Sequence, residues 1–136
     1  MAVPTPIIPF VIALITSGYF PAPPPELPPS NQEMAVAYFQ QGDPYQGIHY
    51  TALAAGHPEL EEWAVRVGTC ESRLRYAPQE NPGYAGIMQH SRRYWPDRSA
   101  MAGWPNSDPE NPYINVYVAI KMVGDLGYPV THWDCR

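Results

Sequence analysis

The sequence predicts a mainly α-helical domain preceded by an extended, proline-rich N-terminal arm. Apolar residues recur at spacings of three and four in residues 58–74, and residues 112–126 are apolar nearly all round. The first pattern is typical of an amphipathic helix and the second of a buried one. Prolines crowd into residues 1–29, and no segment shows the strict alternation of a half-buried strand.

Residues 1–29 form the predicted arm. The apolar stretch from Ile7 to Thr16 is interrupted by Pro9 and is too short to span a membrane. No Lys or Arg precedes it, whereas a signal peptide normally begins with positive charge. We therefore expect the arm to dock on other proteins of a virion or envelope assembly, with a weak export signal as the alternative. Residues 21–29 should form polyproline II, a stiff spacer.

Residues 30–46 are predicted as a helical linker, which leaves residues 47–136 as the main domain. Ser30 and Glu33 have the spacing of a capping box, which starts a short helix, and Gly42 ends it. The residues expected to face inward from this helix are Met34, Ala37, Tyr38 and Gln41.

Capping and terminating residues predict two more helices. A short one is predicted over residues 46–55, where Gly56 ends it. The last long helix begins at the cap Asn111-Pro112 and runs to about Leu126. Because it is apolar on nearly all sides, we expect it to be central and buried.

The helix over residues 58–74 carries the candidate catalytic residue. Pro58 suits its first turn, and its apolar positions share one face: Leu60, Trp63, Ala64, Val67, Cys70 and Leu74. Glu71 falls on that face, where desolvation favours the neutral carboxyl and raises its pKa. Such a group suits general acid catalysis, which needs a proton held near neutral pH. The alternative is an ordinary ion pair with Arg75 at the i, i+4 spacing.

A second element begins fifteen residues after Glu71, at Gly86-Ile87-Met88-Gln89. Asn81-Pro82-Gly83 before it favours a turn, and Gly86 permits close backbone approach. Ile87 and Met88 can wall a cleft, while the Gln89 amide suits sugar hydroxyls. The alternative is a plain loop in which Met88 fills the core.

Together these elements resemble the two signature motifs of the soluble lytic transglycosylase and goose-type lysozyme family. Glu71-Ser72 is similar to its Glu-Ser motif, and Gly86–Gln89 to its Gly-Leu-Met-Gln motif. Residues 111–116 and 131–135 resemble a later helix and the C-terminal end of small actinobacterial or phage-type members. The resemblance covers residues 47–136 and implies a lysozyme-like helical fold. The family's Ala-Tyr-Asn motif is missing from the final third.

The resemblance implies cleavage of the bond between N-acetylmuramic acid and N-acetylglucosamine in bacterial peptidoglycan. Glu71 would protonate the glycosidic oxygen and then act as base, which gives a 1,6-anhydro product. One alternative is a hydrolytic lysozyme, in which Asp97 or Asp108 holds a water. Another is a lysozyme-like domain without turnover, which binds glycan or serves as a structural component of a virion.

Aromatic and polar residues near the two motifs are the candidate sugar contacts. Aromatic faces stack on sugar rings, and their polar tips reach hydroxyls. Tyr117 is one of the tyrosines that could supply the aromatic residue of the missing Ala-Tyr-Asn motif. The predicted substrate-binding residues are Ser72, Tyr84, Gly86, Met88, Gln89, Tyr94 and Tyr117.

Two cysteines occur, Cys70 and Cys135. The family resemblance suggests that they pair, and the position of Cys135 near the end of the chain favours a disulfide. A closure of this length stabilises a fold by about 4 kcal/mol in the chain-entropy model. The alternative is two buried free thiols in a reducing compartment.

Composition limits the partners. The net charge is −5, and the eight Lys and Arg are scattered, so no basic patch favours nucleic acid. No His and Cys set has zinc-ligand spacing, and we predict neither a metal nor another cofactor. The expected partner is the peptidoglycan glycan strand, and the expected location is extracytoplasmic or virion-associated, with no transmembrane span.

Overall fold

The computed structural model describes residues 21–77 and 81–135. Within them the chain is mainly α-helical, which confirms the predicted class. The α-helices are α2 (Asn31–Gln40), α3 (Pro44–Ala54), α4 (Glu61–Ser72), α5 (Trp95–Met101) and α6 (Pro112–Gly124). The other elements are the 3₁₀ turns η1 (Pro58–Leu60) and η2 (Val130–His132) and an antiparallel hairpin of β1 (Tyr84–Ala85) and β2 (His90–Ser91).

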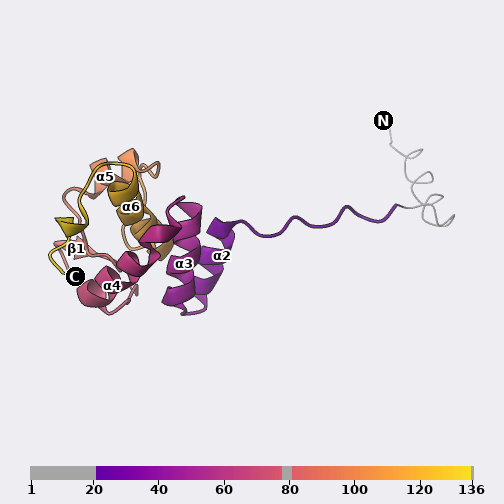
Figure 1. The fold of residues 1–136 in the computed structure, drawn as a ribbon, viewed down its shortest axis with the longest axis horizontal. Coiled ribbons are helices and arrows are strands. Elements are labelled where there is room, and N and C mark those ends of the chain that lie inside the picture. The colour runs from indigo at the N-terminus through magenta and orange to yellow at the C-terminus, as the bar shows by residue number, and fades with distance from the viewer. Residues whose placement is uncertain (1–20, 78–80, 136) are drawn as a thin grey trace, which may run out of the picture.

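α6 is the central helix, as predicted. Asn111 caps its start, where Oδ1 accepts a hydrogen bond from the backbone N–H of Ile114 at 3.1 Å. Most of its side chains are buried, and α2, α3, α4 and α5 all contact it (Figure 1). The helix ends at Gly124, two residues before the predicted end.

α2 and α3 lie side by side and pack against α6 (Figure 1). The predicted capping box is present: Ser30 Oγ accepts from Glu33 N, and Glu33 Oε1 accepts from Ser30 N, both at 3.1 Å. The two helices approach closely at Gly47, where an added Cβ would lie 2.7 Å from the ring of Phe39. The segment predicted as a linker thus contributes the buried Ala35 and Phe39 to the core.

The predicted inward face of α2 is wrong. Its fully buried residues are Ala35 and Phe39, whereas Gln41 is exposed and Met34, Ala37 and Tyr38 are only half-buried. α2 packs against both α3 and α6, and these contacts bury a different set of residues from the stripe expected from sequence.

α4 carries Glu71 in its last turn. The predicted continuous helix from residue 58 is divided, because the 3₁₀ turn η1 precedes it. Trp63, Ala64 and Val67 are buried, as the apolar spacing predicts. The helix ends where Arg73 and Leu74 adopt left-handed conformations, with φ of 57° and 60°.

Residues 21–30 have no regular secondary structure and are exposed. Figure 1 shows them leading away from the helices as an extended stretch. The apolar stretch from Ile7 to Thr16, and the docking or export role expected for it, lie outside the described residues. None of the described helices has both the length and the apolar character needed to cross a lipid bilayer.

Candidate functional site

A four-residue hairpin loop, Gly86–Gln89, lies at the centre of the candidate site. It joins β1 to β2, whose register pairs Tyr84 with Ser91 and Ala85 with His90. A hairpin with strands of two residues is marginal by itself, so the loop depends on support from the rest of the domain.

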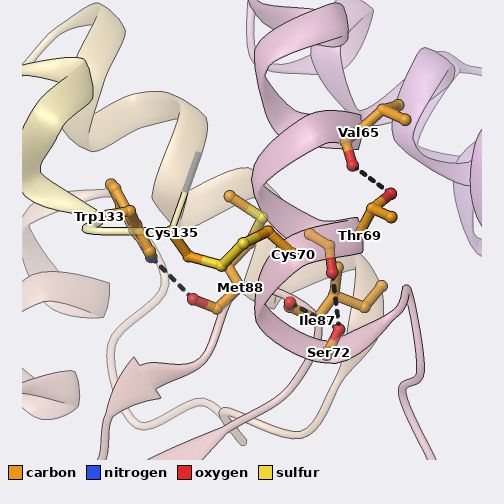
Figure 2. The surroundings of a disulfide bond; sticks show 9 residues. Val65, Thr69, Cys70, Ser72, Ile87, Met88, Trp133 and Cys135 are labelled. Carbon is orange, nitrogen blue, oxygen red and sulfur yellow. Dashed lines mark hydrogen bonds between the residues drawn. A yellow bond between two sulfur atoms is a disulfide. The ribbon is translucent and has the colours of Figure 1, made fainter.

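Three side chains from separate parts of the chain hold the loop backbone. Ser72 Oγ, at the end of α4, donates to the carbonyl of Ile87 at 2.8 Å (Figure 2). Asn115 Oδ1, in α6, accepts from Met88 N at 2.9 Å. Trp133 Nε1, near the C-terminus, donates to Met88 O at 2.7 Å. We call Ser72, Asn115 and Trp133 the loop clamp.

Gly86 permits the close packing that the clamp requires. Its φ is +74°, and an added Cβ would lie 2.1 Å from Asn115 Nδ2 and 2.9 Å from Pro109 O. The same Nδ2 donates to Ala85 O at 2.9 Å and to Pro109 O at 2.8 Å. The Asn115 amide therefore occupies the space that any side chain at position 86 would need.

A second glycine brings the loop against α4. An added Cβ at Gly68 would lie 2.8 Å from Ile87 Cγ2 and 2.9 Å from Leu74 Cδ2. The backbone N–H of Leu74 returns to Gly68 O at 3.2 Å, which closes the helix end. The last turn of α4, which contains Glu71 and Ser72, is thus packed directly on the loop.

Glu71 is half-buried at this helix end. Burial raises the pKa of its carboxyl, a nearby backbone N–H of Cys135 opposes that rise, and the negative charge of Asp134 adds to it. The negative end of the helix dipole also disfavours a charged carboxylate in the last turn. The alternative, an ion pair between Glu71 and Arg75, is not among the ion pairs within residues 21–77 and 81–135. Arg75 Nε donates to Ser72 O.

A disulfide joins Cys70 to Cys135, which confirms the predicted pair (Figure 2). It links the residue before Glu71 to a segment 65 positions along the chain. Trp133 in the same segment packs edge-on against Trp63, with ring centroids 5.3 Å apart. The disulfide and this packing fix the C-terminal segment beside the end of α4.

A cleft of about 400 Å³ opens beside Glu71. Four predicted site residues line it: Glu71, Tyr84, Gln89 and Tyr94. The two tyrosine side chains are exposed, at 52% and 47%. Gln89 has a left-handed φ of 49°, and its Nε2 donates to Gly86 O at 2.9 Å.

The other predicted contact residues occupy different places. Ser72, Gly86 and Met88 are buried beneath the cleft, where they pack or hold the loop. Tyr117 lies away from Glu71 and lines another hollow with Trp104 and Tyr113. The structure therefore brings the two motifs together but does not bring Tyr117 to them.

The remaining wall of the cleft comes from residues that were not predicted as site residues. They are His90, Ser91, Arg98, His132, Trp133 and Asp134. His132, Trp133 and Asp134 directly precede Cys135. Because Cys135 was predicted to pair with Cys70, which is next to Glu71, the disulfide was the one sequence signal that could have placed them near Glu71. Asn115 carried a different signal, because it is a lone amide in an apolar helix.

His90 has a structural place in this wall. Its ring is buried against Trp95 and Trp133, and its Nε2 donates to Asn115 O at 2.8 Å. Burial lowers the pKa of His90 to about 4, so the ring is neutral at neutral pH. It therefore supports the clamp and carries no positive charge into the cleft.

The carboxylates proposed for hydrolysis lie elsewhere. Asp97 and Asp108 are exposed, and neither lines the cleft. Asp134 is the second carboxylate that shares the cleft with Glu71. In the described part of the chain, no group of three or more His, Cys, Asp or Glu is placed to hold a metal ion.

Comparisons with protein-family models, with curated proteins and with solved structures found no match to this chain.

Ser72→Ala should destabilise the protein by about 1–3 kcal/mol, because it leaves the buried carbonyl of Ile87 without its side-chain donor. Thr69→Ala is the matched control. The Ser72 hydroxyl lies 3.1 Å from Gly68 O, one turn back, and the Thr69 hydroxyl makes the equivalent bond to Val65 O, but Thr69 is exposed and does not reach the loop (Figure 2). That change should stay within about 0.5 kcal/mol. Urea unfolding followed by circular dichroism measures both, and equal losses would contradict the clamp.

Asp134→Asn should lower the pKa of Glu71, because it removes a negative charge that favours the protonated carboxyl. The titration of the Glu71 carboxyl carbon, followed by NMR, would then move to lower pH. Asp97→Asn makes the same change in net charge outside the cleft and should leave the titration in place. An unchanged pKa of Glu71 in Asp134→Asn would show that the two carboxylates do not interact.

Proposed function

We propose that this protein cleaves the β-1,4-glycosidic bond between N-acetylmuramic acid and N-acetylglucosamine in bacterial peptidoglycan, with Glu71 as general acid. The lysozyme-like character of the helical domain is part of this proposal. The observation that carries it is the state of Glu71: a half-buried carboxyl with a raised pKa that lines an open cleft. A raised pKa keeps a carboxyl protonated at higher pH, which proton donation to a leaving oxygen requires.

The surroundings of Glu71 support a carbohydrate substrate. Tyr84 and Tyr94 expose their rings in the cleft, and such rings stack on sugars while their hydroxyls make hydrogen bonds. Gln89 adds an amide, which can serve as both donor and acceptor. A cleft of about 400 Å³ falls in the size range of small-ligand sites.

The proposed chemistry needs one carboxyl. Glu71 gives its proton to the glycosidic oxygen as the bond from C1 of the muramoyl ring to that oxygen breaks, and N-acetylglucosamine leaves as an alcohol. The C6 hydroxyl oxygen of the muramoyl ring then bonds to C1, and its proton passes to the Glu71 carboxylate. The product is a 1,6-anhydro sugar, and Glu71 is protonated again. The substrate's N-acetyl group can stabilise the positive charge at C1 between the two steps.

Hydrolysis is a second candidate, because Asp134 shares the cleft with Glu71. In an inverting hydrolysis, a second carboxylate takes a proton from the water that attacks C1. Asp134 replaces Asp97 and Asp108 as the candidate for that role, since only Asp134 lines the cleft. The product then has a free reducing end.

The disulfide supports a place of action outside the cytoplasm. Disulfides persist in oxidising compartments and are rare among cytosolic proteins. Peptidoglycan lies in such an environment, so the proposed substrate and the Cys70–Cys135 bond agree.

Glu71→Gln should reduce the release of soluble fragments from purified peptidoglycan by about 100-fold or more, because the amide cannot donate the catalytic proton. Glu62→Gln is the matched control, since Glu62 is an exposed acid in the first turn of the same helix. It should leave the rate within about twofold, as a surface change away from the cleft. Mass spectrometry of the fragments identifies the product.

The products decide between the two candidates. Anhydro-muropeptides support the transglycosylase reaction, and reducing ends, formed by wild type and lost in Asp134→Asn, support hydrolysis. Full activity in Glu71→Gln, or no release by any form of the protein, would contradict the proposed function.

A further inference from the structure

Arg98 of α5 lines the cleft and is half-buried. Its guanidinium carbon lies 5.1 Å from the ring centroid of Tyr94 and 5.7 Å from that of Tyr128. Contact with two aromatic rings restricts the side chain and orients its planar group.

Within residues 21–77 and 81–135, Arg98 forms no ion pair, whereas Arg92, six positions earlier, pairs with Glu110. The half-buried guanidinium is held in place by the two aromatic rings and has no carboxylate partner among the described residues. It can therefore form a bidentate ion pair with a ligand carboxylate that enters the cleft.

The cleft contains both acidic and basic side chains. Burial and then the charge of Arg98 lower the pKa of His132, while Asp134 raises it. Asp134 also raises the pKa of Glu71. Glu71, Arg98, His132 and Asp134 all line the same cleft, so a positive charge and two carboxyl groups face one ligand site.

We propose that Arg98 forms a subsite for a carboxylate carried by the glycan, which makes the protein selective for acidic glycans over neutral ones. This inference rests on the proposed function and identifies the substrate group, a carboxylate, that the same cleft would recognise. Glu71 would act at the bond to be cleaved, and Arg98 would hold the anionic substituent in the same cleft.

The proposed substrate carries such a group in two forms. The lactyl ether of N-acetylmuramic acid ends in a carboxyl, which is either free or joined to a stem peptide that has carboxylates of its own. Oligomers of N-acetylglucosamine have the same backbone linkage and no carboxylate. The charge at Arg98 can therefore distinguish muramoyl glycans from chitin-like ones.

The test measures binding in the Glu71→Gln background, so that the ligand is not degraded. The ligands are soluble peptidoglycan fragments with stem peptides, the same fragments with their carboxyls converted to amides, and N-acetylglucosamine oligomers of equal length. Adding Arg98→Gln should weaken the binding of the acidic fragments by about tenfold or more. It should change the binding of the amidated fragments and the neutral oligomers by less than about twofold.

Arg93→Gln is the matched control. Arg93 also contacts the ring of Tyr94, at 5.3 Å, but it is exposed and does not line the cleft. The change in net charge and the lost ring contact are the same, so Arg93→Gln should leave all affinities within about twofold. Fragments whose stems have been removed by an amidase retain the lactyl carboxylate. An effect of Arg98→Gln that persists on them would show that Arg98 binds the free lactyl carboxylate as well as those of the stem, and loss of the effect would assign the binding to the stem carboxylates.

Equal weakening of acidic and amidated fragments in Arg98→Gln would overturn the inference, because the arginine would then act through packing alone. No weakening of either would overturn it as well. Failure of the proposed function would give a different result, because wild type would then release no fragments from peptidoglycan. The binding measurements would still decide the role of Arg98, since they depend on the ligand carboxylate and not on cleavage.

Discussion

The site depends on buried side chains that hydrogen-bond to the backbone of one short loop. A hairpin with two-residue strands cannot hold Gly86–Gln89 by its own ladder, so the loop clamp of Ser72, Asn115 and Trp133 replaces it. Each clamp residue comes from a different part of the chain. The loop therefore ties α4, α6 and the C-terminal segment into one structure. The cleft is lined by the hairpin, the end of α4, α5 and the C-terminal segment.

The clamp also sets the electrostatics of Glu71. Ser72 is its neighbour, so the bond to Ile87 O fixes the last turn of α4 against the loop. On the other side, the disulfide from Cys70 brings Asp134 into the same cleft. Burial and this second negative charge both raise the pKa of Glu71. The fixed position of the loop and the raised pKa of Glu71 thus both result from the packing of three segments around the loop.

Sequence reasoning succeeded where the signal is local. The capping box and the buried final helix each depend on residues a few positions apart. So does the turn before Gly86, where Asn81 Oδ1 accepts from the N–H groups of Gly83 and Tyr84. The inward face of α2 could not be predicted, because its tertiary contacts with α3 and α6 decide which residues are buried. Arg98 and Asp134 could not be placed either, since the path of the chain after the loop decides whether they meet Glu71. Tyr117 shows the converse: its aromatic character suited a sugar site, but α6 places it beside Trp104 instead.

The central claim is that a glycan strand lies across Glu71 in the clamped cleft. NMR mapping of the full chain with Glu71→Gln, titrated with a soluble muramoyl glycan fragment, tests it most directly. The account predicts saturable shifts of the backbone amides in Tyr84–Tyr94 and in the segment from His132 to Cys135. Shifts confined to the hollow of Trp104 and Tyr117, or no saturable shifts at all, would contradict it.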